Sequence, residues 1–185
     1  LEGNHGAGTG ASVGKLLGFE HAMKSGIGTC GIQVGDLQVA AIVAVNACGN
    51  VVDYETNELL AGVYDSHSGS VLKAQDVLFQ QMDALRKLPE GNTTIGCFVT
   101  NAKLDKAQCT KIAGIAHNGY ARAIHPVHTM SDGDSIFVLS SGEVEVMADA
   151  VGMLATEMMA KAIKRAVLHA ESAYGLPAHS DVICK

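Results

Sequence analysis

The sequence predicts a layered sandwich of the α+β or α/β type, with helices packed on apolar strands. Two strand-like segments around a short turn are followed by a further strand, a helix, another strand and a long helix. Of the 185 residues, 48% are hydrophobic and 17% charged, so the chain can bury a core and is not intrinsically disordered. Glycine is frequent, with 21 residues, and aromatic residues make up only 4%, so the core must be mainly aliphatic.

The first half of the chain begins with a glycine-rich segment and continues with a hairpin. Residues 32–45 are rich in apolar and β-branched residues on either side of Gly35 and Asp36, a two-residue hairpin turn. The later part of this segment is apolar at almost every position, so we expect a central strand covered on both faces. Residues 50–72 are polar and without periodicity, which predicts a long surface excursion, and 75–88 have helical spacing.

The second half alternates strands with helices. Residues 93–100 and 135–140 are apolar and β-branched, which predicts two strands. Asp105 with Gln108 three residues later has the pattern of a capping box, so we expect a helix over 105–122.

A long amphipathic helix is expected over 146–174. Its apolar residues recur at helical spacing, and it should end at Tyr174 and Gly175, with Pro177 just beyond. The stretch 124–134 reads as a loop. We expect one domain over 1–185, and because the sequence starts at Leu1 without a methionine, we expect it to be a piece of something longer.

Charge and cysteine content exclude several classes of protein. With 13 Lys and Arg against 19 Asp and Glu, the net charge is −6, and no basic patch points to a nucleic-acid partner. No apolar run approaches the length of a membrane span, so no membrane partner is expected. The five cysteines are odd in number and never spaced C-x-x-C, which argues against disulfides and zinc and favours the cytoplasm.

The glycine-rich opening is a poor match to nucleotide-binding loops. A P-loop needs Ser or Thr after its Gly-Lys pair, but Leu16 follows Lys15, and Thr9 stands where the first glycine belongs. Residues 6–11 match a dinucleotide fingerprint loosely, without a preceding strand. A loop packed tightly on another backbone is the favoured interpretation, with Lys15 either a solvated cation or part of a site.

Two further patterns invite a metal interpretation. His125 and His128 stand three apart in a proline-containing loop, with no third ligand spaced nearby. Asp132 and Asp134 could form an acidic calcium turn, but the longer calcium-loop pattern is absent. We therefore expect no metal and no cofactor.

Several short motifs, weak one by one, occur together in one order along the chain and resemble the DmpA aminopeptidase family of self-cleaving N-terminal-nucleophile hydrolases. Within it they look closest to the branch of the nylon-oligomer hydrolases. The motifs are Gly-Ala-Gly-Thr-Gly at 6–10, Gly-Lys at 14–15, Val-Asn at 45–46, Gly-Asn-Thr-Thr-Ile at 91–95, Val-Thr-Asn at 99–101, Ile-His-Pro-Val-His-Thr at 124–129 and Asp-Gly-Asp-Ser-Ile-Phe at 132–137.

The resemblance implies an αββα sandwich and a precursor that cuts its own chain between Asn92 and Thr93. The pieces would be an upstream piece, 1–92, and a nucleophile-bearing piece, 93–185. It also implies an oligomer, a tetramer by analogy. The implied activity is hydrolysis of amide bonds in short peptides, β-peptides or aliphatic oligoamides.

Site residues follow from the same resemblance. Thr93 matches the nucleophile, Asp132 and Asp134 the acidic pair that supports it, and Lys15 and Asn46 the site residues of the upstream portion. We expect these five side chains to converge on one cleft, with Asn46 donating to the oxyanion.

One feature of the family is missing. Its members carry a further N-terminal segment with a site tyrosine in a glycine-rich stretch, and neither Tyr54 nor Tyr64 has that context. We therefore expect a companion N-terminal segment or chain.

The chemistry of Thr93 explains why cleavage would be needed. A threonine hydroxyl is a weak nucleophile without a base. If it attacks the Asn92 carbonyl, the resulting ester is opened by water and Thr93 gains a free α-amino group. The ordinary pKa of such an amine is about 7.7–8.0, which suits a general base near neutral pH. Two alternatives remain, an acyltransferase of the ornithine acetyltransferase type and an uncleaved, non-catalytic domain.

Overall fold

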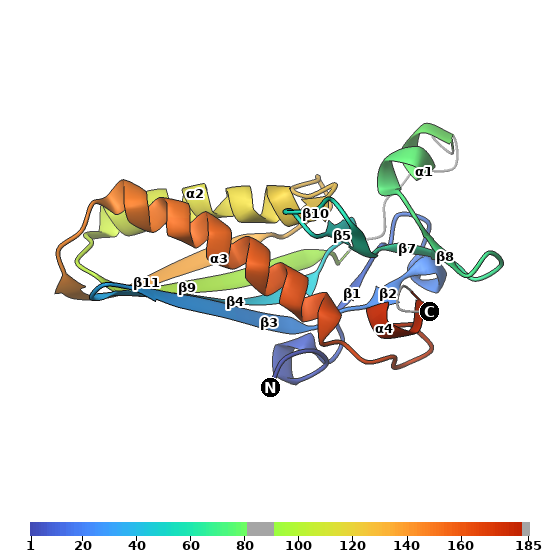
Figure 1. Cartoon of the computed structure of the whole chain (residues 1–185). Coiled ribbons are helices and arrows are strands. Elements are labelled where there is room, and N and C mark those ends of the chain that lie inside the picture. Colours follow the sequence, from blue (N-terminus) through green and yellow to red (C-terminus); the bar gives the residue numbers. More distant parts are fainter. Residues whose placement is uncertain (81–90, 183–185) are drawn as a thin grey trace.

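The computed structural model describes residues 1–80 and 91–182 (Figure 1). The strands are β1 (Ser12–Val13), β2 (Met23–Lys24), β3 (Ile27–Val34), β4 (Leu37–Asn46), β5 (Asn50–Val52), β6 (Leu59–Ala61), β7 (Val63–Asp65), β8 (Ser70–Leu72), β9 (Thr93–Ala102), β10 (Ile124–His125) and β11 (Ser135–Val144). The helices are η1 (Gly6–Gly8), η2 (Phe19–His21), α1 (Ala74–Gln80), α2 (Lys106–Ala123), α3 (Ala148–Leu168) and α4 (His179–Val182).

The main sheet has the strand order β11-β9-β4-β3. Strand β4 pairs antiparallel with β3 and β9, whereas β9 and β11 run parallel. Strands β3 and β4 are joined at Gly35, whose φ of +60° suits a tight turn, so the predicted hairpin is confirmed. The predicted strands at 93–100 and 135–140 are β9 and β11, each of which extends beyond its predicted end.

Helices α2 and α3 lie side by side on one face of this sheet (Figure 1). The Asp105 side chain accepts from the Gln108 amide and the Gln108 side chain accepts from the Asp105 amide, so the predicted capping box is confirmed. Beneath the helices, Val39, Val43 and Phe98 are buried from alternate positions of β4 and β9. The mainly aliphatic core predicted from composition therefore lies between the helix layer and the sheet.

The opposite face of the sheet is not covered by the described residues. Its apolar side chains Ile42, Ile95, Val99, Phe137 and Leu139 are 39–61% exposed. Strand β4 is central, as expected, but within the described residues only one of its faces is covered, so the cover expected on the second face does not come from this part of the chain. Two helices of this length cover one face of a four-stranded sheet, and the alternation of buried and exposed residues along β4 follows from that.

Residues 50–72 form more structure than predicted. They contain β5, β6, β7 and β8, of three residues each, and Val51, Ala61 and Val63 are fully buried. The prediction of a surface excursion is wrong for this part, because strands so short leave no periodicity to detect. Figure 1 shows them beyond one end of the helix layer.

The predicted helix ends also need correction. Helix α3 ends at Leu168 and not at 174, because the side chain of Asn4 bonds to the backbone N–H and C=O of Glu171 and replaces helical partners there. Helix α1 begins at Ala74, and the remainder of the helix predicted over 75–88 lies outside the described residues.

Glycines of the opening segment allow close backbone contact, as the packed-loop interpretation requires. A Cβ on Gly14 would lie 1.9 Å from the carbonyl carbon of Gly62, and the φ of Gly14 is +74°. The loop after β1, which includes Lys15, also lies against the segment after β4. The Lys15 amide donates to Cys48 O in that segment. Within residues 1–80 and 91–182, no helix has the length and apolarity to span a bilayer.

Candidate active site

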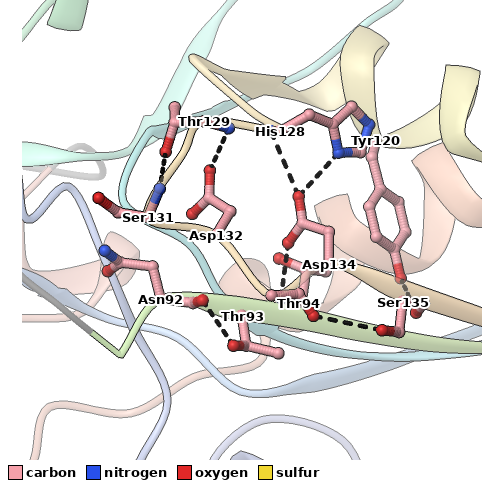
Figure 2. Close-up of polar contacts among 11 residues, drawn as sticks. Asn92, Thr93, Thr94, Tyr120, His128, Thr129, Ser131, Asp132, Asp134 and Ser135 are labelled. Atoms are coloured by element: carbon pink, nitrogen blue, oxygen red, sulfur yellow. Dashed lines mark hydrogen bonds and ion pairs between the residues drawn. The ribbon is translucent and has the colours of Figure 1, made fainter.

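The site lies at one end of the main sheet, where three chain segments meet. Strand β4 ends at Asn46, directly opposite Thr93, the first residue of β9. Asn92 forms a parallel bridge with Asp132, in the loop that leads into β11. Residues from both halves of the sequence therefore surround the bond between Asn92 and Thr93. Figure 2 shows those that lie between Asn92 and Ser135.

Two donors converge on the carbonyl oxygen of Asn92. The Thr93 hydroxyl donates to it at 2.5 Å, and the Gly133 amide donates to it at 2.9 Å. Gly133 lies so close that a Cβ there would stand 2.8 Å from Thr93 Oγ1. The hydroxyl is therefore held beside the carbonyl that it would attack, and this carbonyl is polarised by a backbone N–H.

Asp134 holds the backbone just after the nucleophile. Its Oδ1 accepts from the Thr94 amide at 2.8 Å, and its Oδ2 lies 2.9 Å from His128 Nδ1. The Asp134 side chain is only 4% exposed, so these donors replace the water that a carboxylate requires.

Asp132 is bound differently. Its Oδ2 accepts from the Thr129 amide at 2.8 Å, whereas its buried Oδ1 has no hydrogen-bond partner within the described part of the chain. The Thr93 hydroxyl itself donates to Asn92 O.

Lys15 is a fully buried cation beside these groups. Its Nζ donates to Asn46 Oδ1 at 2.8 Å and to Asn46 O at 3.1 Å. Burial lowers the pKa of Lys15 to about 8, although the nearby Cys48 and Asp132 act in the opposite direction. Lys15 is therefore a buried cation bound to Asn46 and not a solvated one.

Asn46 has a defined amide orientation. Its Oδ1 accepts from Lys15 Nζ and from the Ser12 amide at 3.2 Å, and its Nδ2 donates to Gly91 O at 3.0 Å. Because the oxygen is held by two donors, the NH₂ group faces the segment that precedes the scissile bond. This is the group that an oxyanion would need.

The structure thus gathers all six residues of the sequence hypothesis, namely Asn92, Thr93, Asp132, Asp134, Lys15 and Asn46. The sequence does not point to Ser12 or Gly133, which act through backbone amides that leave no sequence signal. His128 enters the sequence argument as a possible metal ligand with His125 and as part of the family-like motif over 124–129. His125 instead contacts Ala121 O, and the described residues contain no cluster of three metal-ligating side chains.

Comparison with known proteins identifies the family. The profile of peptidase family S58 matches residues 1–180. The chain belongs to peptidase family S58. This is the DmpA family of the sequence resemblance, and its members are amide hydrolases and aminopeptidases.

Curated relatives of this S58 chain include two groups. An uncharacterized aminopeptidase of Mycobacterium leprae is 35% identical over 96% of this chain and 51% of its own length. The 6-aminohexanoate-oligomer endohydrolase of Paenarthrobacter ureafaciens is 30% identical over 89% of this chain and 50% of its own length. The chain therefore spans about half the length of the curated relatives it matches.

Solved structures show the fold. The L-aminopeptidase D-Ala-esterase/amidase of Ochrobactrum anthropi, described as a variant of the Ntn hydrolase fold, matches 99% of this chain and 51% of its own with a TM-score of 0.63 at 20% identity. A β-aminopeptidase of a Burkholderia species matches with the same TM-score at 21% identity. The predicted fold class is thus confirmed as a mixed α+β variant of the Ntn hydrolase fold, with helices packed on sheets.

Proposed function

We propose that this S58 chain belongs to an amide-bond hydrolase that cuts itself between Asn92 and Thr93 and then uses Thr93 as its N-terminal nucleophile. The observation that carries the proposal is the placement of the Thr93 hydroxyl and the Gly133 amide on one carbonyl oxygen, that of Asn92. A hydroxyl in hydrogen-bond contact with the preceding carbonyl is held in the place from which an N-to-O acyl shift begins.

In self-cleavage, Thr93 Oγ1 bonds to the Asn92 carbonyl carbon, and the proton that Oγ1 loses is transferred overall to the Thr93 nitrogen. The Gly133 N–H stabilises the negative charge that develops on the carbonyl oxygen. The bond between that carbon and the Thr93 nitrogen breaks, the nitrogen takes up a proton, and an ester remains. Water opens the ester and leaves a carboxylate on Asn92 and a free amine on Thr93.

In turnover, the amine of Thr93 would take the proton from its own hydroxyl as the latter attacks an amide substrate. Asn46 is the proposed oxyanion donor, because its amide oxygen is already occupied and its Nδ2 is directed toward residue 91. In the uncut chain that Nδ2 donates to Gly91 O, so release of the segment ending at Asn92 would free the donor. Lys15 would hold Asn46 and offset negative charge at Asp132.

The proposed substrates are short peptides, β-peptides or aliphatic oligoamides. Support comes from the names of relatives that act on β-peptides or on 6-aminohexanoate oligomers, at 21% and 30% identity. Placement in the nylon-oligomer branch remains a proposal, since the identity to mycobacterial aminopeptidases is 35–36%. The uncovered face of the main sheet supports a companion segment or chain, and an oligomer such as a tetramer, as further parts of the enzyme.

Intact-mass measurement under denaturing conditions tests the proposal. We expect two polypeptides, one ending at Asn92 and one starting at Thr93, in the parent and in the control Thr110→Ala, whose hydroxyl lies exposed on α2. Thr93→Ala should remain whole and inactive. Cutting of Thr93→Ala at this bond would refute the proposal, and an assay with an added amine acceptor would detect an acyltransferase instead.

A further inference from the structure

His128 stands out because it contacts the site through Asp134 but has no role in the mechanism above. Its Nδ1 lies 2.9 Å from Asp134 Oδ2, and its backbone N–H donates to the same oxygen at 3.3 Å. The φ of His128 is +56°, a conformation that residues other than glycine rarely adopt. Such backbone strain persists only where the surroundings hold it, and it is frequent at functional sites.

Neighbouring rings hold the His128 imidazole in place. From α2, the His117 ring meets it edge-on with centroids 4.9 Å apart, and the Tyr120 ring stacks on it at 6.1 Å. Figure 2 shows the imidazole turned toward the Asp134 carboxylate. The titratable side chains that contact His128 in the described part of the chain are the Asp134 carboxylate and the rings of His117 and Tyr120.

The pair of His128 and Asp134 connects to the nucleophile through the backbone. The second carboxylate oxygen of Asp134 accepts from the Thr94 amide, directly after Thr93. A carboxylate rotates freely about its last bond unless both oxygens are bound. The imidazole therefore fixes the plane of the Asp134 carboxylate and with it the position of the Thr94 amide.

We propose that His128 is a positioning residue for Thr93, acting through Asp134 as a side-chain donor to the outer carboxylate oxygen. The inference rests on the proposed function, because it assumes that Thr93 is the nucleophile. His128 donates from Nδ1 in its neutral form as well as when protonated, so the role does not depend on its charge. Loss of the donor leaves Asp134 Oδ2 with the longer backbone contact, and Thr93 is less well held against the Asn92 carbonyl.

The backbone geometry suggests the variants. Gly and Asn both tolerate a positive φ, so neither His128→Gly nor His128→Asn adds strain. His128→Asn keeps an N–H donor one bond beyond Cγ, where His128 has Nδ1, but loses the ring. His128→Gly loses both. His125→Asn, in the same loop but bonded to Ala121 O, is the matched control.

The experiment measures the rate of self-cleavage after cell-free synthesis of the whole protein, from the ratio of uncut to cut chain in intact-mass spectra. We expect His128→Gly to be slowed about tenfold or more, the size of effect of one hydrogen bond to a charged group. His128→Asn should stay within about threefold of the parent, and His125→Asn should be unchanged. Added imidazole should accelerate His128→Gly, because the half-exposed side chain leaves an accessible space.

Parental cleavage by His128→Gly would overturn the proposal. So would equal slowing of the Gly and Asn variants without rescue by imidazole, which would assign the effect to ring packing. Thr93→Ala separates this failure from that of the proposed function. If Thr93→Ala stays whole while the His128 variants cut normally, only the positioning role is lost.

Discussion

At the scale of single residues, the candidate site contains a cation whose burial disfavours its charge. Lys15 is fully buried, and its hydrogen bonds go to Asn46. Burial lowers its pKa from 10.5 to about 8, so the folded state holds the Lys15 proton less tightly than the unfolded state does. Burial of the protonated Lys15 side chain thus has a cost in stability, which is a common trade at the active sites of enzymes.

This cost predicts that the free energy of unfolding depends on pH. Between pH 8 and 10.5 the unfolded chain binds more protons than the folded chain, so the free energy of unfolding rises with pH. Relative to Lys15→Met, the parent should gain about 3 kcal/mol between pH 7 and pH 10.5. Urea unfolding of both proteins in a Thr93→Ala background, which keeps the chain whole, measures the difference. Equal pH dependence of the two would show that Lys15 has an ordinary pKa.

The amide of Asn46 supports a second prediction at this scale. Removal of one oxyanion donor lowers kcat by about 10²–10³, or roughly 2.7–4 kcal/mol. Asn46→Ala should therefore lose that much activity on an amide substrate. Gln38→Ala, on the same strand at its far end, should keep the parental rate. Near-normal turnover by Asn46→Ala would remove Asn46 from the oxyanion site.

At the scale of elements, the loop before β11 acts as one wall of the site. It supplies Asp132, which pairs with Asn92, then Gly133, whose amide donates to Asn92 O, and then Asp134, which accepts from the Thr94 amide. Two carboxylates two residues apart reach one site because Asn92 and Asp132 pair in parallel, just before β9 and β11 do. The parallel pairing of the two segments therefore explains how Asp132 and Asp134, two residues apart, lie near the same bond.

Steric crowding in this loop can be tested directly. In Gly133→Ala, the new Cβ would lie 2.8 Å from Thr93 Oγ1, so the nucleophile must move and self-cleavage should slow at least about tenfold. Gly114→Ala is the matched control, since a Cβ there on α2 meets nothing within 4 Å. The control should cut normally and unfold with about 0.5–1 kcal/mol more free energy, as expected for Ala in a helix. For both variants, intact mass measures self-cleavage and urea unfolding measures the free energy of unfolding.

At the scale of the whole molecule, the arrangement of layers is one-sided. Helices α2 and α3 cover one face of the main sheet, and the apolar residues on the other face are exposed in this chain. Thr93 lies at the end of the same row as Ile95 and Val99, because residues two apart on a strand point to one face. Whatever covers this face therefore also borders Thr93.

An apolar face of this kind predicts self-association of the 185-residue chain on its own. Phe137→Glu combined with Leu139→Lys should shift it toward monomer in light scattering. Met153→Lys, an equally exposed site on the outer side of α3, should have no effect. A parent chain that is already monomeric would contradict the prediction and weaken the case for a companion segment.

The sequence by itself determined the β-hairpin, the capped helix and the two later strands. Each of these depends on neighbours in the chain, such as the turn at Gly35 or the Asp105 capping box, so local chemistry is sufficient. The candidate nucleophile Thr93 was proposed from the order of motifs that resemble the family, and not from local chemistry. Tertiary structure alone decided the end of α3, where Asn4 binds the backbone of Glu171, and the fold of residues 50–72. It also decided the contacts of Ser12, Gly133 and His128, because their partners lie 34, 41 and 6 residues away and these three residues donate through backbone amides or a ring nitrogen. Backbone donors have no side-chain signature, and a contact between distant residues exists only after the sheet has brought their strands together.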